Sequence, residues 1–236
     1  MKHEVFFKDL GVRSFKEVWD LQEVLLKQNV ETKAAINNLP PSAVSNLSTI
    51  SHLLFVEHNP VYTLGKRVHQ ENILIEEEER AKKGIEFLHI NRGGDITFHG
   101  LQQLVGYPIL DLDKFKTDLG WYLRSLEEVI IMTMAEYGLK GERSIGETGV
   151  WVEPTIAGKE RKICAMGIKC SRWITMHGFA FNVNTDLSYF NNIIPCGIAN
   201  KQVTSLQKEL GTTVPMSDVK QRVKRNFEYV FNAYLV

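Results

Sequence analysis

Apolar residues recur every three or four positions in three long segments of the chain, a spacing typical of amphipathic helices. The segments cover residues 15–36 and 118–137 and a stretch that begins near residue 217. The apolar faces are formed by Phe15, Val18, Leu21 and Leu25 in the first segment and by Val219, Val223, Phe227 and Val230 in the last. We therefore predict three long helices, with a further short, charged helix over residues 76–83.

Shorter apolar runs, several of them alternating with polar residues, predict β-strands. They cover residues 3–8, 53–56, 85–90, 148–152, 162–169 and 173–183. Residues 96–98 and 104–110, which a short turn-like stretch separates, predict a hairpin. Because strands and helices follow one another irregularly, their order favours an α+β fold over a regular βαβ repeat. The length of 236 residues predicts a single domain over residues 1–236.

The charge balance and the length of the apolar runs exclude several classes of protein. The chain has 28 basic and 28 acidic residues, for a formal net charge of +0, whereas general nucleic-acid binders are usually basic. Its apolar runs fall well short of the roughly 20 residues that a membrane-spanning helix needs. Residues 1–4 resemble neither a secretion signal nor a transit peptide, and three cysteines without framework spacing suit a reducing compartment. We predict a cytoplasmic protein that binds neither nucleic acid nor membranes.

One cysteine lies in a predicted loop whose neighbouring residues suit a catalytic role. Cys196 lies between Pro195, which stiffens the chain, and Gly197, which permits close approach of a ligand or of another backbone segment. It is a candidate nucleophile, although a free cysteine is more often a small buried hydrophobe. Cys164 and Cys170 fall in a predicted strand and are most simply packed side chains. No spacing of cysteine and histidine predicts a metal site.

A catalytic thiol needs a nearby cation or base, because a thiol with a pKa near 8.5 is only a few per cent thiolate at neutral pH. Lys162, at the head of a predicted strand, could stabilise the thiolate as an ammonium or accept its proton as an amine. His177 and His99 are rival bases, because imidazole is the commoner partner of a catalytic thiol. The alternative for Lys162 is a solvated basic turn shared with Lys159 and Arg161.

A glycine-rich stretch precedes the predicted hairpin. Gly93 and Gly94 permit close approach of a ligand to the backbone, and Arg92 and His99 bring hydrogen-bond donors to the same stretch. The stretch is neither a P-loop nor a dinucleotide fingerprint. It is either a ligand-binding loop or a turn between two strands with a solvated arginine.

The same stretch resembles the signature of the lipoyl(octanoyl) transferases, the LipB family. The matching run is Arg92-Gly93-Gly94-Asp95-Ile96-Thr97-Phe98-His99-Gly100, followed by Gln103-Leu104-Val105-Gly106-Tyr107-Pro108-Ile109. Further matches are residues 57–65, residues 162–167 with 176–183, and residues 194–198 with 204–206. The motifs occur in the family's order over most of the chain, which makes the resemblance highly specific.

The resemblance implies the fold of biotin and lipoate protein ligases, a mixed sheet flanked by helices that is also similar to class II aminoacyl-tRNA synthetases. It implies transfer of an octanoyl group from octanoyl-acyl carrier protein to a lysine of a lipoyl domain, without a cofactor or metal. The acceptors would be E2 subunits of 2-oxoacid dehydrogenases and the glycine cleavage H protein. The family's nucleophile falls on Cys196 and its partner lysine on Lys162, with His177 as a possible supporting residue. Its substrate contacts fall on Arg92, Gly93, Gly94, Asp95, Ile96, Thr97, Phe98, His99, Ala165, Met166, Gly167, Gly178, Phe179 and Ala180.

The chain departs from the family's pattern at one place, where Leu101-Gln102 replaces the usual Pro-Gly after His99-Gly100. Three alternatives remain at this level. They are an ATP-dependent lipoate or biotin ligase of the same fold, an amidotransferase that moves octanoyl groups between lipoyl domains, and a non-catalytic acyl-binding protein. The ligases need no nucleophilic cysteine, and their glycine-rich stretch is similar to Arg-Arg-x-Ser-Gly-Gly-Gly-x-Val. The chain has only two glycines at that position.

Overall fold

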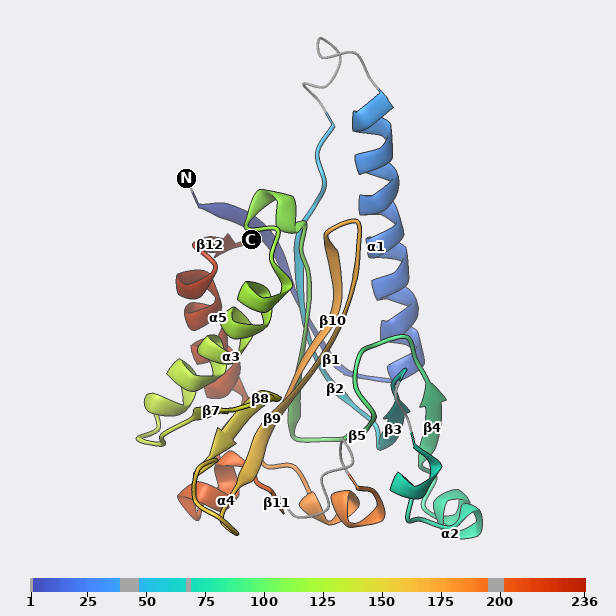
Figure 1. The fold of residues 1–236 in the computed structure, drawn as a ribbon, viewed down its shortest axis with the longest axis vertical. Helices are drawn as coiled ribbons and strands as arrows, with labels where there is room; N and C mark the ends of the chain where they lie inside the picture. The colour runs from blue at the N-terminus through green and yellow to red at the C-terminus, as the bar shows by residue number, and fades with distance from the viewer. Residues whose placement is uncertain (1, 39–46, 67–68, 195–201) are drawn as a thin grey trace.

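The computed structural model describes residues 2–38, 47–66, 69–194 and 202–236. A long twisted sheet forms the middle layer of the molecule (Figure 1). Helices α3 (Leu119–Ala135) and α5 (Met216–Val230) cover one face, and helix α1 (Phe15–Asn38) covers the other face together with a small second sheet. The α+β fold with a mixed sheet flanked by helices, predicted from the sequence, is confirmed.

The long sheet has nine strands within the described residues, and eight of them follow one another side by side. In spatial order these are β12 (Ala233–Leu235), β1 (His3–Arg13), β2 (His52–His58), β6 (Gln103–Ile109), β10 (Ile174–Asn182), β9 (Arg161–Ser171), β8 (Glu147–Val152) and β7 (Glu142–Ser144). The short strand β11 (Gln202–Val203) pairs with β9 in parallel. Strand β1 is parallel to both neighbours, whereas the sheet from β2 to β7 is antiparallel, so the sheet is mixed.

The helices form where the apolar periodicity predicts them. The side chains of Val219, Val223 and Phe227 on α5 are fully buried against α3 and the sheet. Asp118 caps the start of α3, since its side chain accepts a hydrogen bond from the Trp121 backbone N–H at 2.9 Å. The buried face of α1, which includes Phe15 and Val18, packs on the opposite side of the sheet. No helix in the described ranges is long and apolar enough to cross a membrane.

The smaller sheet consists of β4 (Glu86–His89), β3 (Val61–Leu64) and β5 (Ile96–His99). The predicted hairpin between residues 96–98 and 104–110 is wrong, because β5 pairs with β3 whereas β6 pairs with β2 and β10. The two strands part because their side chains join different cores. Ile96 and Phe98 pack in a separate cluster beneath the small sheet, whereas Leu104 belongs to the main core.

Several short elements carry too few residues for a periodic signal and were not predicted. They are β3, β7, β11, β12 and helix α4 (Leu206–Leu210). The short charged helix is confirmed as α2 (Glu77–Lys82). In the described part of the chain, three 3₁₀ turns connect other elements, at Gln70–Asn72, Leu112–Lys114 and Leu187–Asn192.

His58, at the end of β2, is fully buried as a neutral imidazole. Its Nδ1 lies 3.0 Å from the Arg13 carbonyl oxygen and therefore donates, and its Nε2 lies 2.9 Å from the Tyr107 hydroxyl. Burial lowers the pKa of His58 to about 4, because the interior disfavours the imidazolium. The unfolded chain, with a pKa near 6.5, therefore binds more protons than the folded chain between these values.

We expect the free energy of unfolding to fall as the pH is lowered from about 6.5 toward 4, and His58 contributes up to about 1.4 kcal/mol per pH unit. Urea unfolding at a series of pH values measures this slope. His58→Asn should flatten the slope, whereas His69→Asn, at a histidine whose side chain is 64% exposed, should leave it unchanged. Equal slopes in the wild type and in His58→Asn would contradict this prediction.

Candidate active site

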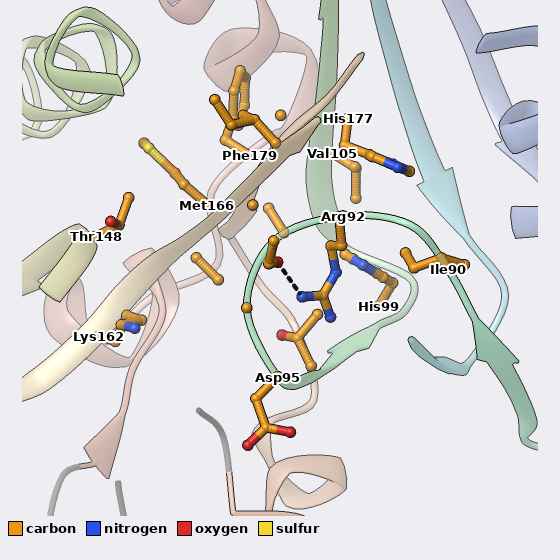
Figure 2. A pocket seen from close by; sticks show the side chains of 18 of the residues that line it. Ile90, Arg92, Asp95, His99, Val105, Thr148, Lys162, Met166, His177 and Phe179 are labelled. Atoms are coloured by element: carbon orange, nitrogen blue, oxygen red, sulfur yellow. Dashed lines mark hydrogen bonds between the residues drawn. The ribbon is translucent and has the colours of Figure 1, made fainter. Parts of the chain in front are cut away.

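A cavity of about 810 Å³ lies where the small sheet faces the middle of the long sheet (Figure 2). Strands β9 and β10 form one wall, and β5 with the loop that precedes it forms the other. The cavity gathers nearly all the substrate contacts expected from the family resemblance. Those that line it are Arg92, Gly93, Gly94, Asp95, Thr97, His99, Ala165, Met166, Gly167, Gly178, Phe179 and Ala180.

Ile96 and Phe98 are the two expected contacts that the structure does not bring to this cavity. Alternate residues of β5 face opposite sides, so Thr97 and His99 line the cavity while Ile96 and Phe98 point into the core of the small sheet. The Phe98 ring stacks on Tyr189 with their centroids 4.5 Å apart. The family motif is a continuous run, but only one face of its strand reaches the cavity.

Small residues shape the wall on the long sheet. Gly167 pairs with Gly178 across β9 and β10, and Ala165 pairs with Ala180. The glycine-rich loop lies directly on this strip, since the Gly93 N–H donates to the Ile168 carbonyl at 3.0 Å. A Cβ atom on Gly167 would lie 3.0 Å from the Gly93 oxygen, so a larger residue there would push the loop away by a few tenths of an ångström. The result is a slot with little side-chain bulk on one side.

Arg92 holds the glycine-rich loop against the small sheet. Its guanidinium donates to the Thr63 carbonyl at 2.7 Å, to the Thr63 hydroxyl at 3.0 Å and to the Gly93 carbonyl at 3.0 Å. The residue is only 8% exposed, so a positive charge is built into the cavity wall. Asp95, at the edge of the cavity, accepts hydrogen bonds from the Ile96 backbone N–H and from the Asn72 side chain. Both charged residues of the loop thus have a structural role in addition to lining the cavity.

Lys162 lies on the side of the cavity formed by β8 and β9, next to Thr148 (Figure 2). It is held between two strands, because Trp151 of β8 is its partner on one side and Val203 of β11 is its partner on the other. The Lys162 Nζ lies 4.6 Å from the centroid of the Trp151 ring. The lysine is therefore part of the cavity and not a residue of a solvated turn. Its neighbour Arg161 is bound by Glu209 and Glu153.

The two candidate histidines are buried and neutral. Asn91 donates to Glu23, so its oxygen must accept from Nε2–H of His177, which lies 3.0 Å away. Burial, with a smaller contribution from the Arg92 charge, lowers the pKa of His177 to about 3. Burial also holds the pKa of His99 well below 6.5, and its Nδ1–H donates to the Gln103 side-chain oxygen at 2.9 Å. Neither imidazole can supply a positive charge to a thiolate at neutral pH.

Cys196 lies outside the described residues, but the chain on both sides of its segment is fixed beside the cavity. The Ile194 N–H donates to the carbonyl of Asn72, a residue of the cavity lining, at 2.8 Å. On the other side, Gln202 pairs with Arg161, and the Thr204 N–H donates to the Lys162 carbonyl at 2.9 Å.

The other two cysteines are not suited to catalysis. Cys164 is fully buried in the main core, where burial raises the pKa of its thiol well above the usual value. Cys170 is half-buried, and burial raises its pKa as well. The prediction that Cys164 is a packed side chain is confirmed. Among the residues described, no group of three or more histidine, cysteine or carboxylate side chains could hold a metal ion.

Leu101-Gln102, the departure from the family's pattern, keeps a turn of the kind that glycine favours. Gln102 has a φ of 60°, in the left-handed region. Its carbonyl accepts from the Asn184 N–H at 3.0 Å, and its side-chain oxygen accepts from the Asn184 amide at 2.8 Å. These contacts compensate for the cost of the backbone conformation.

Other cavity residues were not predicted as substrate contacts. Phe15 of α1, Val105 and Tyr107 of β6, and Glu147 and Thr148 of β8 contribute to the lining. Phe15 was predicted only as part of an apolar helix face. Its position over the cavity depends on the packing of α1 against the sheet, which periodicity does not encode.

Comparison with known proteins agrees with this geometry. Residues 14–228 match the family described as the lipoyl protein ligase A/B catalytic domain. The octanoyltransferases of Christiangramia forsetii and Flavobacterium johnsoniae are each 52% identical to the chain, over all of it and over 99% and 100% of their own lengths. The lipoate protein ligase of Thermoplasma acidophilum, from a study of an archaeal lipoylation system, has a similar fold with a TM-score of 0.69. It is 16% identical, over 99% of this chain and 86% of its own.

The resemblance predicted from the motifs is thereby confirmed. The full-length match to octanoyltransferases and the match of the catalytic-domain family together show that the chain belongs to the lipoyl protein ligase A/B family, among its octanoyltransferases.

Proposed function

We propose that this protein transfers an octanoyl group from octanoyl-acyl carrier protein to a lysine of lipoyl domains, through a thioester on Cys196. The acceptors are lipoyl domains of 2-oxoacid dehydrogenase E2 subunits and the glycine cleavage H protein, and the reaction takes place in the cytoplasm without a cofactor. The relatives named octanoyltransferase support the reaction. The main structural support for the proposal is the cavity, a slot that small residues line on one wall and that has Lys162 at one side.

Chain connectivity supports Cys196 as the nucleophile. Only one residue lies between Cys196 and Ile194, so chain geometry allows at most about 7 Å between their Cα atoms. Ile194 is hydrogen-bonded to Asn72 of the cavity lining. Gln202, six residues further along the chain, lies on the strand beside Lys162. The described residues on both sides of the segment that carries Cys196 thus lie at the cavity, one side next to Asn72 and the other next to Lys162.

The proposed reaction has two acyl-transfer steps. The Cys196 thiolate attacks the carbonyl carbon of the carrier thioester, a new C–S bond forms, and the carrier thiolate leaves and takes a proton. The neutral amine of the lipoyl-domain lysine then attacks the enzyme thioester. A C–N bond forms, the amine gives up a proton to water and the Cys196 thiolate is released. Donor and acceptor bind in turn to one reaction centre, so ping-pong kinetics are expected.

The slot supports recognition of a medium-length acyl chain. An octanoyl tail buries about seven CH₂ or CH₃ groups at about 0.8 kcal/mol each, which sums to roughly 5–6 kcal/mol before binding costs. Backbone and methyl groups of Gly167, Gly178, Ala165 and Ala180 offer apolar surface without filling the space. We propose these residues, with Met166 and Phe179, as acyl contacts.

Cys196→Ser should reduce octanoyl transfer from octanoyl-acyl carrier protein to a lipoyl domain by at least about 10³-fold, because it removes the nucleophile. Mass spectrometry should show one octanoyl group on Cys196 when wild-type enzyme is incubated with the donor alone. Cys170→Ser is the matched control and should retain both transfer and labelling. Undiminished transfer by Cys196→Ser would refute the thioester route.

The same assay separates the alternatives. Activity with free octanoate and ATP, in place of the acyl carrier donor, would identify a ligase. Octanoyl transfer that starts only from a modified lipoyl domain would identify an amidotransferase. Binding of the donor without labelling of Cys196 or transfer would identify a non-catalytic acyl-binding protein.

Enlarging a small residue of the slot should shorten the preferred acyl chain. Ala180→Leu adds three carbons to a wall residue that is 4% exposed. We expect kcat/KM for octanoyl donor to fall by about tenfold or more while that for butanoyl donor changes little, since each excluded CH₂ costs about 0.8 kcal/mol. Ala135→Leu, on the exposed end of α3 away from the cavity lining, is the matched control. An unchanged octanoyl-to-butanoyl ratio in Ala180→Leu would show that the tail binds elsewhere.

A further inference from the structure

Lys162 and Trp151 are direct neighbours on adjacent strands. They are register partners in the antiparallel pair of β8 and β9, so their side chains project on the same face of the sheet. The indole is 1% exposed, and the Lys162 Nζ lies 4.6 Å from the centroid of its ring. This distance is within the roughly 6 Å over which a cation is attracted to an aromatic face.

A local irregularity of β8 creates this alignment. The register between β8 and β9 shifts between Val150 and Trp151. At the preceding residue, Gly149, φ is +120°, and a Cβ atom would lie 2.5 Å from the Cys164 carbonyl oxygen, so only glycine fits. The fully buried Glu127 fixes the irregular segment by accepting from the Gly149 N–H at 2.9 Å. Strand β8 is thus held so that Trp151 stands beside Lys162.

The described surroundings of the Lys162 amine are dominated by one aromatic face. Within the described ranges, no carboxylate or hydrogen-bond acceptor is in contact with its Nζ, and the indole face of Trp151 is the partner present. A neutral amine gains little from the negative face of an aromatic ring, whereas an ammonium is attracted to it. Trp gives the strongest such attraction of the aromatic residues, and burial of the indole keeps competing water away from one side of the ammonium.

We propose that Trp151 is a positioning residue that holds Lys162 as an ammonium at the cavity, where it stabilises the Cys196 thiolate by charge. This inference rests on the proposed function and concerns a choice that the sequence left open, between Lys162 as a cation and Lys162 as a base. The thiol proton passes to solvent, and Lys162 keeps its own protons while the thiolate attacks the thioester carbonyl. The departing carrier thiolate takes its proton from water.

The test is the pH dependence of Cys196 alkylation by iodoacetamide, followed by mass spectrometry of the peptide that contains Cys196. Trp151→Leu removes the aromatic face, and Trp151→Phe weakens it. At pH 7 we expect the alkylation rate to fall about threefold to tenfold in Trp151→Leu and less in Trp151→Phe, with the pH midpoint moved upward in that order. Profiles that superimpose on that of the wild type would overturn the proposal.

Two substitutions of Lys162 separate a cation from a base. Lys162→Arg keeps a permanent charge that also stacks on an indole, so it should retain a low alkylation midpoint. Lys162→Met should raise the midpoint by about one unit or more. If Lys162 acts as a base, Lys162→Arg would keep a low alkylation midpoint but lose octanoyl transfer, because a guanidinium cannot accept a proton.

A double-mutant cycle excludes a merely structural role for Trp151. If Trp151 acts through Lys162, adding Trp151→Phe to Lys162→Met should cause no further shift in the alkylation midpoint. Additive shifts would show that the indole acts by another route. Trp151→Phe preserves an aromatic side chain, so the cycle can still be measured if Trp151→Leu does not fold. Thermal unfolding shows whether each Trp151 variant is folded.

The outcomes also distinguish this inference from the proposed function. Loss of octanoyl labelling at Cys196 in every variant, the wild type included, would contradict the proposed function. The wild type could be labelled normally while Trp151→Phe leaves the alkylation profile unchanged, both alone and together with Lys162→Met. That result would contradict only the role of Trp151.

Discussion

The cavity depends on the close contact between the glycine-rich loop and the middle of the long sheet. Gly93 is hydrogen-bonded to the Ile168 carbonyl, and the loop backbone passes so near Gly167 that a Cβ atom there would crowd it. Arg92 fixes the other side of the loop through Thr63 of the small sheet. Two sheets with separate cores are thereby held face to face, and the space left between them is a slot with a largely backbone wall.

This arrangement separates the charges that line the slot. Burial and the Arg92 charge keep the pKa values of His177 and His99 low, so two residues that look like bases in the sequence act as neutral hydrogen-bonding groups. The Arg92 guanidinium donates hydrogen bonds to backbone and hydroxyl oxygens. Lys162 lies on a different wall, beside an aromatic ring. The position of each group in the fold, more than its residue type, therefore decides which one can influence a thiol.

The long helices and strands could be predicted from the sequence, because burial of one face makes apolar residues recur at regular intervals. The face of α5 that carries Val219 and Phe227 is visible as a helical spacing and is buried as expected. Pairing of β5 was not predictable, because neighbouring strands usually form hairpins and nothing local reveals that Phe98 joins a different core. Ile96 and Phe98 show the same limit at the site, since a motif records a run of residues but not which face of the strand meets the cavity. The turn at Gln102 shows that a residue other than glycine adopts the left-handed conformation here, which the residue type alone does not predict.

Pairing with two strands fixes the backbone of Lys162 on one side of the cavity. Its strand is held by β8 on one side and by β11 on the other, so its backbone has little freedom. Strand β11 begins where the segment containing Cys196 ends, and the strand pairing ties the exit of that segment to the residues beside Lys162. The pairing of β11 therefore fixes the chain that follows residue 201 to the same strand that carries Lys162.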